Sequence, residues 1–322
     1  MTHPDQKAEP LVSVILTVYN RLTFFSEALK SVEAQTLRDY EVIVADDSGT
    51  GAARAASLAA NDPRIRYQAN PVSLGVALSV RSALMEARGK YIAVLNDDDV
   101  WEPEFLARLA APLEADTGRV LAFCDHAIMD ADGRIDERAS VRTSERFARS
   151  SLREGNIPDP KAFVLRHNGV PLAMGALVRA AAIPSERIVG DVAGAYDFWI
   201  SSLLAGSGGD FYYVPARLTR YRVHGGMETN RRDPEKTRCL AFIARSLLSE
   251  PAFVEQREFL HRWLASLTVR AGRDYLYFDR VADARQSFRS AFRMSAGWKP
   301  LAGYLVSMAP ARLRRVAGVT GA

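Results

Sequence analysis

Cysteine is scarce in this chain of 322 residues. The two cysteines, Cys124 and Cys239, lie far apart and in no metal-ligand spacing. Neither a disulfide framework nor a zinc cluster is therefore indicated, and a reducing cytoplasm is the expected compartment.

Long apolar runs are also missing. No run approaches the roughly 20 residues needed to span a bilayer. The first ten residues, MTHPDQKAEP, are polar and lack the apolar core of a signal peptide, so we expect residues 1–10 to be disordered.

Two familiar phosphate-binding loops are absent. There is no G-x-x-x-x-G-K-[ST] loop, and no G-x-G-x-x-G follows the first predicted strand. A nucleotide pocket in this protein must therefore be of another kind.

Acidic residues are missing from the C-terminal part of the chain, although the net charge is only +4. The stretch from Ala284 to Ala322 has seven basic residues and no acidic one: Arg285, Arg289, Arg293, Lys299, Arg312, Arg314 and Arg315. Peripheral contact with the inner face of the cell membrane is one interpretation, and a solvated basic helix is the other. Nucleic acid is not an expected partner, because this basic stretch is the only feature that favours it and the sequence contains no known nucleic-acid-binding module.

The composition that remains, 48% hydrophobic and 25% charged, is that of a soluble globular protein. Within the first 125 residues, apolar runs alternate with helical patterns. The predicted strands are 11–18, 40–45, 64–69, 90–96 and 119–124, and the predicted helices are 23–35, 52–60, 75–89 and 102–115. This alternation predicts an α/β fold with a mostly parallel sheet covered on both faces.

The rest of the chain is less regular at first. Residues 129–136, MDADGRID, predict a turn between two short strands, because the third ligand and the distal Glu of a calcium loop are absent. A helix is expected over 196–208, and a strand, a turn and a second strand over 211–224.

After Asp233 the pattern is helical throughout. Residues 270–294 read as an amphipathic helix pair, similar to one tetratricopeptide-like repeat. A single such unit cannot bury its apolar face alone. We therefore expect 233–322 to be a helical appendage that packs on the main domain or on a second subunit, as in a homodimer.

Polar residues collect where the predicted strands end. Thr17 and Tyr19 follow the first strand, Asp47 the second, and Asn96 to Asp99 the fourth. In parallel sheets, ligands bind beyond the carboxyl ends of the strands. Adjacent carboxylates at that edge suit a hard divalent cation, Mn²⁺ or Mg²⁺, whose shell is completed by substrate phosphates.

These features together resemble the family 2 glycosyltransferases, which have the GT-A fold. Four segments carry the resemblance, in the family's order: 12–20, 34–51, 75–103 and 196–226. It implies a mixed, mostly parallel sheet flanked by helices over 11–232, with a nucleotide-binding half (11–125) and an acceptor half (126–232). It also implies inverting transfer from a nucleotide-sugar, a UDP-sugar before others, to a glycan or lipid-linked acceptor.

The resemblance also assigns roles to residues. The positions that match nucleotide contacts are Thr17, Tyr19, Asp47, Arg81, Asn96 and Asp97. The positions that match the metal site are Asp98, Asp99 and His224. Alternatives stay open: Arg81 could be a surface residue of its helix, and His224 could make a structural hydrogen bond. Asn96 replaces the first acid of the family's D-x-D-D, and its amide oxygen could contact the metal or a ribose.

The general base departs from the family pattern. The usual Glu-Asp pair falls on Gly194-Ala195, so Asp197 and Asp191 are the nearest candidates. Asp197 could equally cap its helix. This departure motivates a second hypothesis, a catalytically silent nucleotide-sugar-binding or scaffold protein. A sugar nucleotidyltransferase would need a Gly-rich basic loop after the first strand, and TVYNRLTFF is not one.

Overall fold

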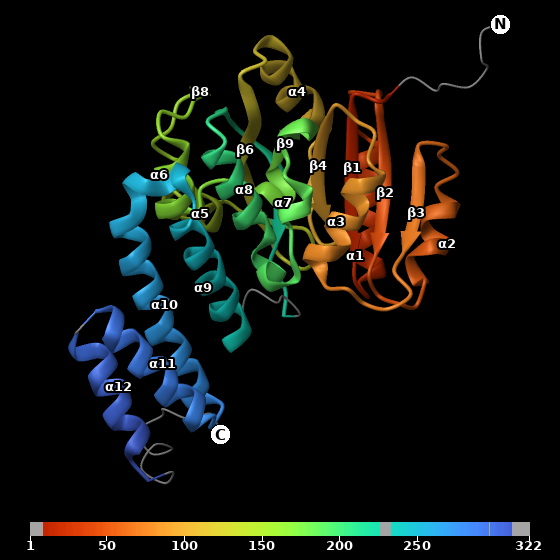
Figure 1. Ribbon diagram of the computed structural model, residues 1–322. Coiled ribbons are helices and arrows are strands. Elements are labelled where there is room, and N and C mark those ends of the chain that lie inside the picture. Colours follow the sequence, from red (N-terminus) through yellow and green to blue (C-terminus); the bar gives the residue numbers. More distant parts are fainter. Residues whose placement is uncertain (1–8, 226–232, 296, 311–322) are drawn as a thin grey trace, which may run out of the picture. The chain divides into compact units, whose positions relative to one another are not determined.

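The computed structural model describes residues 9–225, 233–295 and 297–310, and these form two compact units (Figure 1). The first unit comprises the described residues up to Gly190 and those from Tyr196 to Gly225. The second unit comprises Asp191–Ala195 and the described residues from Asp233 onward.

The first unit contains all the strands of the sheet. They are β1 (Val12–Val18), β2 (Tyr40–Asp46), β3 (Ile65–Ala69), β4 (Tyr91–Asn96), β5 (Val100–Trp101), β6 (Arg119–Met129), β7 (Ile135–Asp136), β8 (Gly155–Asn156), β9 (Ala176–Arg179) and β10 (Asp210–Arg222). Its helices are α1 (Leu22–Glu33), α2 (Ala52–Ala59), α3 (Val76–Glu86), α4 (Phe105–Ala115), α5 (Glu137–Arg146), α6 (Pro160–His167), α7 (Leu172–Gly175) and α8 (Tyr196–Gly206).

The sheet is mixed and mostly parallel, as predicted. Its strand order is β3-β2-β1-β4-β9-β6-β10-β5, and Figure 1 shows the part from β3 to β6. Pairing is parallel between β2 and β3, β1 and β2, β1 and β4, and β6 and β10. Strand β9 runs antiparallel to both β4 and β6, so these two strands point the same way as β1.

Burial on both faces explains why β1 and β2 are apolar along their whole length. All seven residues of each strand are buried. Helices α1 and α4 contribute Phe25 and Phe105 to the core cluster that covers these strands. Strand β3 lies at the edge of the sheet and is only partly buried, which agrees with its weaker apolar pattern.

Two predicted boundaries were wrong. Residues 210–222 form one strand, β10, and not two strands around a turn. Its pairing with β6 shifts register around Pro215, which has no N–H to donate and so lies at a bulge instead of ending the strand. Strand β6 continues past Cys124 to Met129, because Asp125 and His126 are buried in place and pair with β10. The turn predicted at 129–136 is confirmed, since β7 folds back antiparallel on β6.

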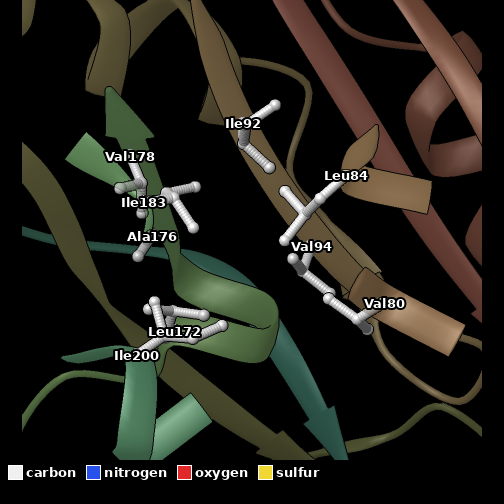
Figure 2. Close-up of a pocket in the computed structure, with 9 residues that line it drawn as sticks. All are labelled: Val80, Leu84, Ile92, Val94, Leu172, Ala176, Val178, Ile183 and Ile200. Carbon is white, nitrogen blue, oxygen red and sulfur yellow. The ribbon is translucent and has the colours of Figure 1, made fainter. Parts of the chain in front are cut away.

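A small apolar cavity of about 10 Å³ lies inside the first unit (Figure 2). Aliphatic side chains from α3, β4, β9 and α8 line it, among them Val80, Val94 and Ile200. It has room for about one water molecule and offers no polar group, so it is a packing void and not a nucleotide site.

The second unit is helical, with α9 (Pro234–Leu248), α10 (Arg257–Tyr277), α11 (Val281–Met294) and α12 (Trp298–Met308). Helices α9 and α10 pack around Ala244 and Leu264, and α10 and α11 pack around Leu276 and Phe288. The helix pair expected over 270–294 is present as the end of α10 and all of α11. Among the described residues, no helix is both long enough and apolar enough to cross a membrane.

Candidate active site

The polar residues predicted at the strand ends do lie along one edge of the sheet. Thr17 of β1 is in register with Asn96 of β4, and Val18 is in register with Asp46 of β2. The Thr17 hydroxyl lies 3.3 Å from the Asn96 amide oxygen, to which it donates. The loops after β1, β2 and β4 therefore begin side by side.

Arg21 is the cation that faces the acidic triplet. Its Nε lies 3.1 Å from Oδ1 of Asp97, and its Nη1 pairs with Oδ2 of Asp98. One guanidinium thus bridges two adjacent carboxylates. The sequence analysis did not single out Arg21; its place directly after Tyr19-Asn20, on the loop opposite the triplet, is the only signal that could have found it.

Asp97 anchors the loop that follows β1. Its Oδ2 accepts a hydrogen bond of 2.9 Å from the backbone N–H of Tyr19, and its side chain is almost completely buried. Burial raises the pKa of Asp97 to about 7, against the opposing charge of Arg21. The Tyr19 ring itself is 53% exposed and so remains accessible to a ligand.

Asp98 and His224 lie together although 126 residues separate them in the chain. His224 follows the end of β10, and its Nε2 is 3.2 Å from Oδ2 of Asp98. The ring of Phe24, 5.0 Å away from centroid to centroid, supports the imidazole. The side chains of Asp98 and His224 are only 13% and 9% exposed.

Asp99, which was predicted as a metal ligand, contacts β10 and Asn96. It is fully buried, and its Oδ1 accepts a 3.1 Å hydrogen bond from the backbone N–H of Arg222. Its Oδ2 lies 3.5 Å from the Asn96 side-chain amide. Burial, together with the neighbouring Asp98 charge, raises the pKa of Asp99 well above its usual range. These contacts are those of a residue that fastens the acidic loop to β10.

Asp47 holds the loop that leads into α3. Its Oδ1 accepts from the Asn70 amide at 2.9 Å and from the Leu74 N–H at 2.8 Å. Its Oδ2 accepts from the Ser73 hydroxyl at 2.8 Å and from the Gly75 N–H at 2.9 Å. Four protein donors therefore surround the carboxylate that was predicted to contact a base or a ribose.

Arg81 extends from α3 toward the chain that precedes α8. Its Nη1 makes a long hydrogen bond, 3.4 Å, to the carbonyl of Ile188. Trp199 on α8 is buried, and its indole N–H donates to the Arg187 carbonyl at 2.7 Å, so it is a core residue and not an exposed platform for a sugar.

The two candidate bases have different surroundings. Asp197 lies in the first turn of α8, where its Oδ1 accepts from the backbone N–H of Phe198, and burial raises its pKa. Asp191 belongs to the second unit and pairs with Arg238 at 2.9 Å. Asp197 is thus the candidate that shares a unit with the acidic triplet.

Tyr196, which the sequence analysis also missed, carries a buried hydroxyl with no hydrogen-bond partner among the described residues. Burial raises its pKa well above the usual range, and the carboxylates of Asp197, Asp99 and Asp98 add to the shift. The Tyr196 hydroxyl is therefore within electrostatic reach of Asp98 and Asp99.

No group of three or more His, Cys, Asp or Glu side chains with metal-binding geometry occurs among the described residues. Asp98 and His224 nevertheless bring one carboxylate oxygen and one imidazole nitrogen together. Both are ligand types that Mn²⁺ accepts, and such a cation usually takes its other ligands from phosphates and water. The residues therefore fit a cation held jointly by protein and substrate.

The fold defines the class of protein. A parallel sheet whose carboxyl edge carries an acidic loop, with β9 inserted antiparallel, is the GT-A architecture, and solved GT-A structures are similar to it. Staphylococcus aureus TarS 1–349 in complex with UDP-GlcNAc has a TM-score of 0.63 at 14% identity, over 95% of this chain and 92% of that one. The mannosyltransferase PcManGT from Pyrobaculum calidifontis, in complex with GDP-Man and Mn²⁺, has a TM-score of 0.56 at 17% identity, over 98% and 84%.

The sequence comparisons agree with the fold. The family model described as Glycosyl transferase family 2 matches residues 13–167, a little under half of the chain. Escherichia coli (strain K12) WcaA, named for colanic acid biosynthesis, is 36% identical over 103 residues, which are 31% of this chain and 37% of WcaA. Escherichia coli WfgD, named a UDP-Glc:alpha-D-GlcNAc-diphosphoundecaprenol beta-1,3-glucosyltransferase, is 36% identical over 91 residues, 28% of this chain and 36% of WfgD. The chain thus matches little more than a third of the length of either relative.

Proposed function

We propose that this chain is a metal-dependent, inverting glycosyltransferase. It moves a sugar from a nucleotide-diphosphate-sugar, preferentially a UDP-sugar, to a hydroxyl of a glycan or lipid-linked acceptor. The observation that carries the proposal is the convergence of Asp98, His224 and Arg21 at the carboxyl edge of a GT-A sheet. The names of WfgD and of the TarS complex with UDP-GlcNAc support a uridine nucleotide, and the name of WfgD supports a lipid-linked acceptor.

The donor would lie across the ends of β1 and β4. Asp98 and His224 would hold Mn²⁺ or Mg²⁺, and the exposed Tyr19 ring and Thr17 would face the nucleoside, with Arg81 on the α3 side. When bound there, such a cation would offset the negative charge that develops on the leaving diphosphate. Asp47, Asn96 and Asp97 would shape this pocket through the loops that they hold, and Asp99 would fix the acidic loop to β10.

Asp197 would act as the general base. As the acceptor oxygen forms its bond to the anomeric carbon, the bond from that carbon to the diphosphate breaks, and Asp197 takes the hydroxyl proton. A carboxylate whose pKa is raised by burial is a stronger base than an ordinary Asp. Attack on the face opposite the leaving group inverts the configuration, as in inverting glycosidases.

A thermal-shift panel tests the donor site. UDP, GDP, dTDP and CMP are added with and without Mn²⁺ to the wild type, to Asp98→Asn and to Asp132→Asn. Asp132 is an exposed acid in the turn between β6 and β7, so its variant controls for the loss of one negative charge. We expect UDP with Mn²⁺ to raise the melting temperature of the wild type and of Asp132→Asn, but not of Asp98→Asn. If no nucleotide shifts the wild type, the proposal fails.

Hydrolysis of the donor separates an enzyme from the silent alternative, which the Gly194-Ala195 departure favours. We expect slow release of UDP from the UDP-sugar, and a kcat of sugar transfer that falls by about 10²–10⁴-fold in Asp197→Asn with UDP binding unchanged. Asp191→Asn, the matched control, should keep its activity. A loss confined to Asp191→Asn would move the base to that residue, and binding of UDP without any turnover would support the silent protein.

A further inference from the structure

Helix α12 presents an apolar stripe to solvent. Its exposed members are Trp298 (72% exposed), Leu301 (49%), Leu305 (58%) and Met308 (60%). Their spacing of three or four residues places them on one face of the helix. The helix has only 11 residues, and packing within the second unit does not bury this apolar stripe.

The opposite face of α12 accounts for the packing of this helix in the second unit. Gly303 lies so close to the Phe288 ring of α11 that a Cβ atom there would be 2.4 Å from it, and Ser307 is buried. Arg285 of α11 donates to the Ser307 carbonyl at 3.0 Å, and Arg289 donates to the Tyr304 hydroxyl at 2.6 Å. The exposed stripe is therefore not needed to hold α12 in place.

Two exposed basic residues lie on α12 and on the neighbouring helix α11. Lys299 on α12 and Arg293 on α11 are both exposed. The sequence from Ala284 to Ala322 has seven basic residues and no acidic one. A short helix with an aromatic and aliphatic face and a basic flank is suited to lie in the plane of an anionic bilayer surface.

We propose that α12 and its basic flank dock on an anionic lipid bilayer, with Trp298, Leu301, Leu305 and Met308 inserted among the lipids. A second copy of the chain fits less well, because a two-fold contact would bring two identical basic surfaces together. A nucleic acid would leave the apolar stripe exposed to water. This inference goes beyond the proposed transfer reaction and does not depend on it, although a bilayer is where a lipid-linked acceptor would be found.

Co-sedimentation with vesicles tests the proposal on the full chain without donor or metal. Vesicles of phosphatidylcholine alone are compared with vesicles in which about a third of the lipid is phosphatidylglycerol. We expect binding at least about tenfold tighter to the anionic vesicles and weakened by salt, since each basic residue near the surface adds about 1 kcal/mol. No preference for anionic vesicles would overturn the proposal.

Variants locate the contact. Leu301→Gln/Leu305→Gln should lower vesicle binding by about tenfold or more, because two inserted side chains are lost. Leu58→Gln on α2 and Met85→Gln on α3 are matched controls, since these side chains are 66% and 74% exposed and lie in the first unit. Equal melting temperatures of all variants would show that the fold is intact. Equal loss in a control variant would contradict the assignment to α12.

Trp298 supplies an independent signal. Of the four tryptophans, Trp298 is exposed, whereas Trp101 and Trp199 are buried and Trp263 is partly buried. Its fluorescence should shift to the blue on addition of anionic vesicles and be quenched by brominated lipid, and Trp298→Tyr should lack the response. If sedimentation equilibrium instead shows a dimer that Leu301→Gln/Leu305→Gln abolishes, with no vesicle binding, α12 is a self-association surface and the proposal is wrong.

Discussion

At the scale of single residues, the acidic triplet is already neutralised in part by the protein itself. Arg21 bridges Asp97 and Asp98, so a metal ion that binds Asp98 must compete with a guanidinium for Oδ2. A charged hydrogen bond of this kind contributes about 1.5–3 kcal/mol. We therefore expect Arg21→Gln to bind Mn²⁺ about tenfold more tightly than the wild type in the absence of nucleotide.

Electron paramagnetic resonance of free Mn²⁺ measures this affinity directly and requires no turnover. Arg134→Gln is the matched control, since Arg134 makes an exposed pair with Asp132 at 2.9 Å away from the site. Weaker Mn²⁺ binding in Arg21→Gln would mean that Arg21 orients Asp98 for the metal and does not compete with it.

Sequence patterns could identify the site's residues but not their partners. The spacing of strands and acids indicated that Asp47, Asp97 and Asp98 would gather at one edge, and they do. It could not show that Asp47 would accept four hydrogen bonds from its own loop, or that Asp97 would hold the Tyr19 backbone. Arg21 and Tyr196 were missed because a lone Arg or Tyr has no motif, and only the tertiary fold brings them to the carboxylates.

At the scale of elements, the parallel strands were predictable because burial on both faces leaves a continuous apolar run. The prediction of two strands over 211–224 was wrong because a proline normally ends a strand. Only the pairing of β10 with β6 shows that the register shifts around Pro215 instead. Strand β6 was predicted too short because Asp125 and His126 look like a loop. Their burial becomes reasonable only with Arg149, which comes from a distant segment.

The junction of α3 and β4 gives a test at this scale. A Cβ atom on Gly89 would lie 2.3 Å from the backbone nitrogen of Ser13 on β1, and the Gly89 N–H donates to the Ser13 hydroxyl at 2.8 Å. Because the atom that a Cβ would meet belongs to the backbone of a central strand, Gly89→Ala should lower the free energy of unfolding by about 3 kcal/mol, at the upper end for overpacking.

Gly208→Ala is the matched control, since Gly208 has φ +85° but nothing within 4 Å of a Cβ. It should lose only about 1–2 kcal/mol through backbone strain. Urea denaturation followed by circular dichroism compares them, and equal losses would exclude the steric explanation.

At the scale of the whole molecule, the residues of the proposed active site and the buried polar residues that stabilise the fold lie in different parts of the first unit. The carboxyl edge of β1, β2 and β4 carries the proposed chemistry, whereas a second polar cluster is buried at β6. There Arg149 donates to Oδ1 of Asp125 and to the Gly169 carbonyl, both at 2.9 Å, and lies 3.1 Å from Nδ1 of His126. Because His126 belongs to this buried cluster, the stability of the fold is sensitive to acid.

His126 determines the sign of that sensitivity. Burial, and then the charges of Arg149 and Arg217 against that of Asp125, lower its pKa to about 3, below the ordinary value near 6.5. Its neutral form therefore stabilises the fold above about pH 6.5. This stability is lost as the pH falls toward 3, because the unfolded chain binds a proton that the folded chain does not bind.

Between roughly pH 7 and pH 5.5, the free energy of unfolding of the wild type should fall by about 1 kcal/mol more than that of His126→Asn. The raised pKa of Asp97 acts in the opposite direction, but it is common to both proteins and cancels in the difference. His167→Asn, at an exposed histidine on α6, is the control for the loss of one imidazole. Urea denaturation at several pH values measures all three, and a wild-type slope in His126→Asn would show that His126 is not the group that titrates.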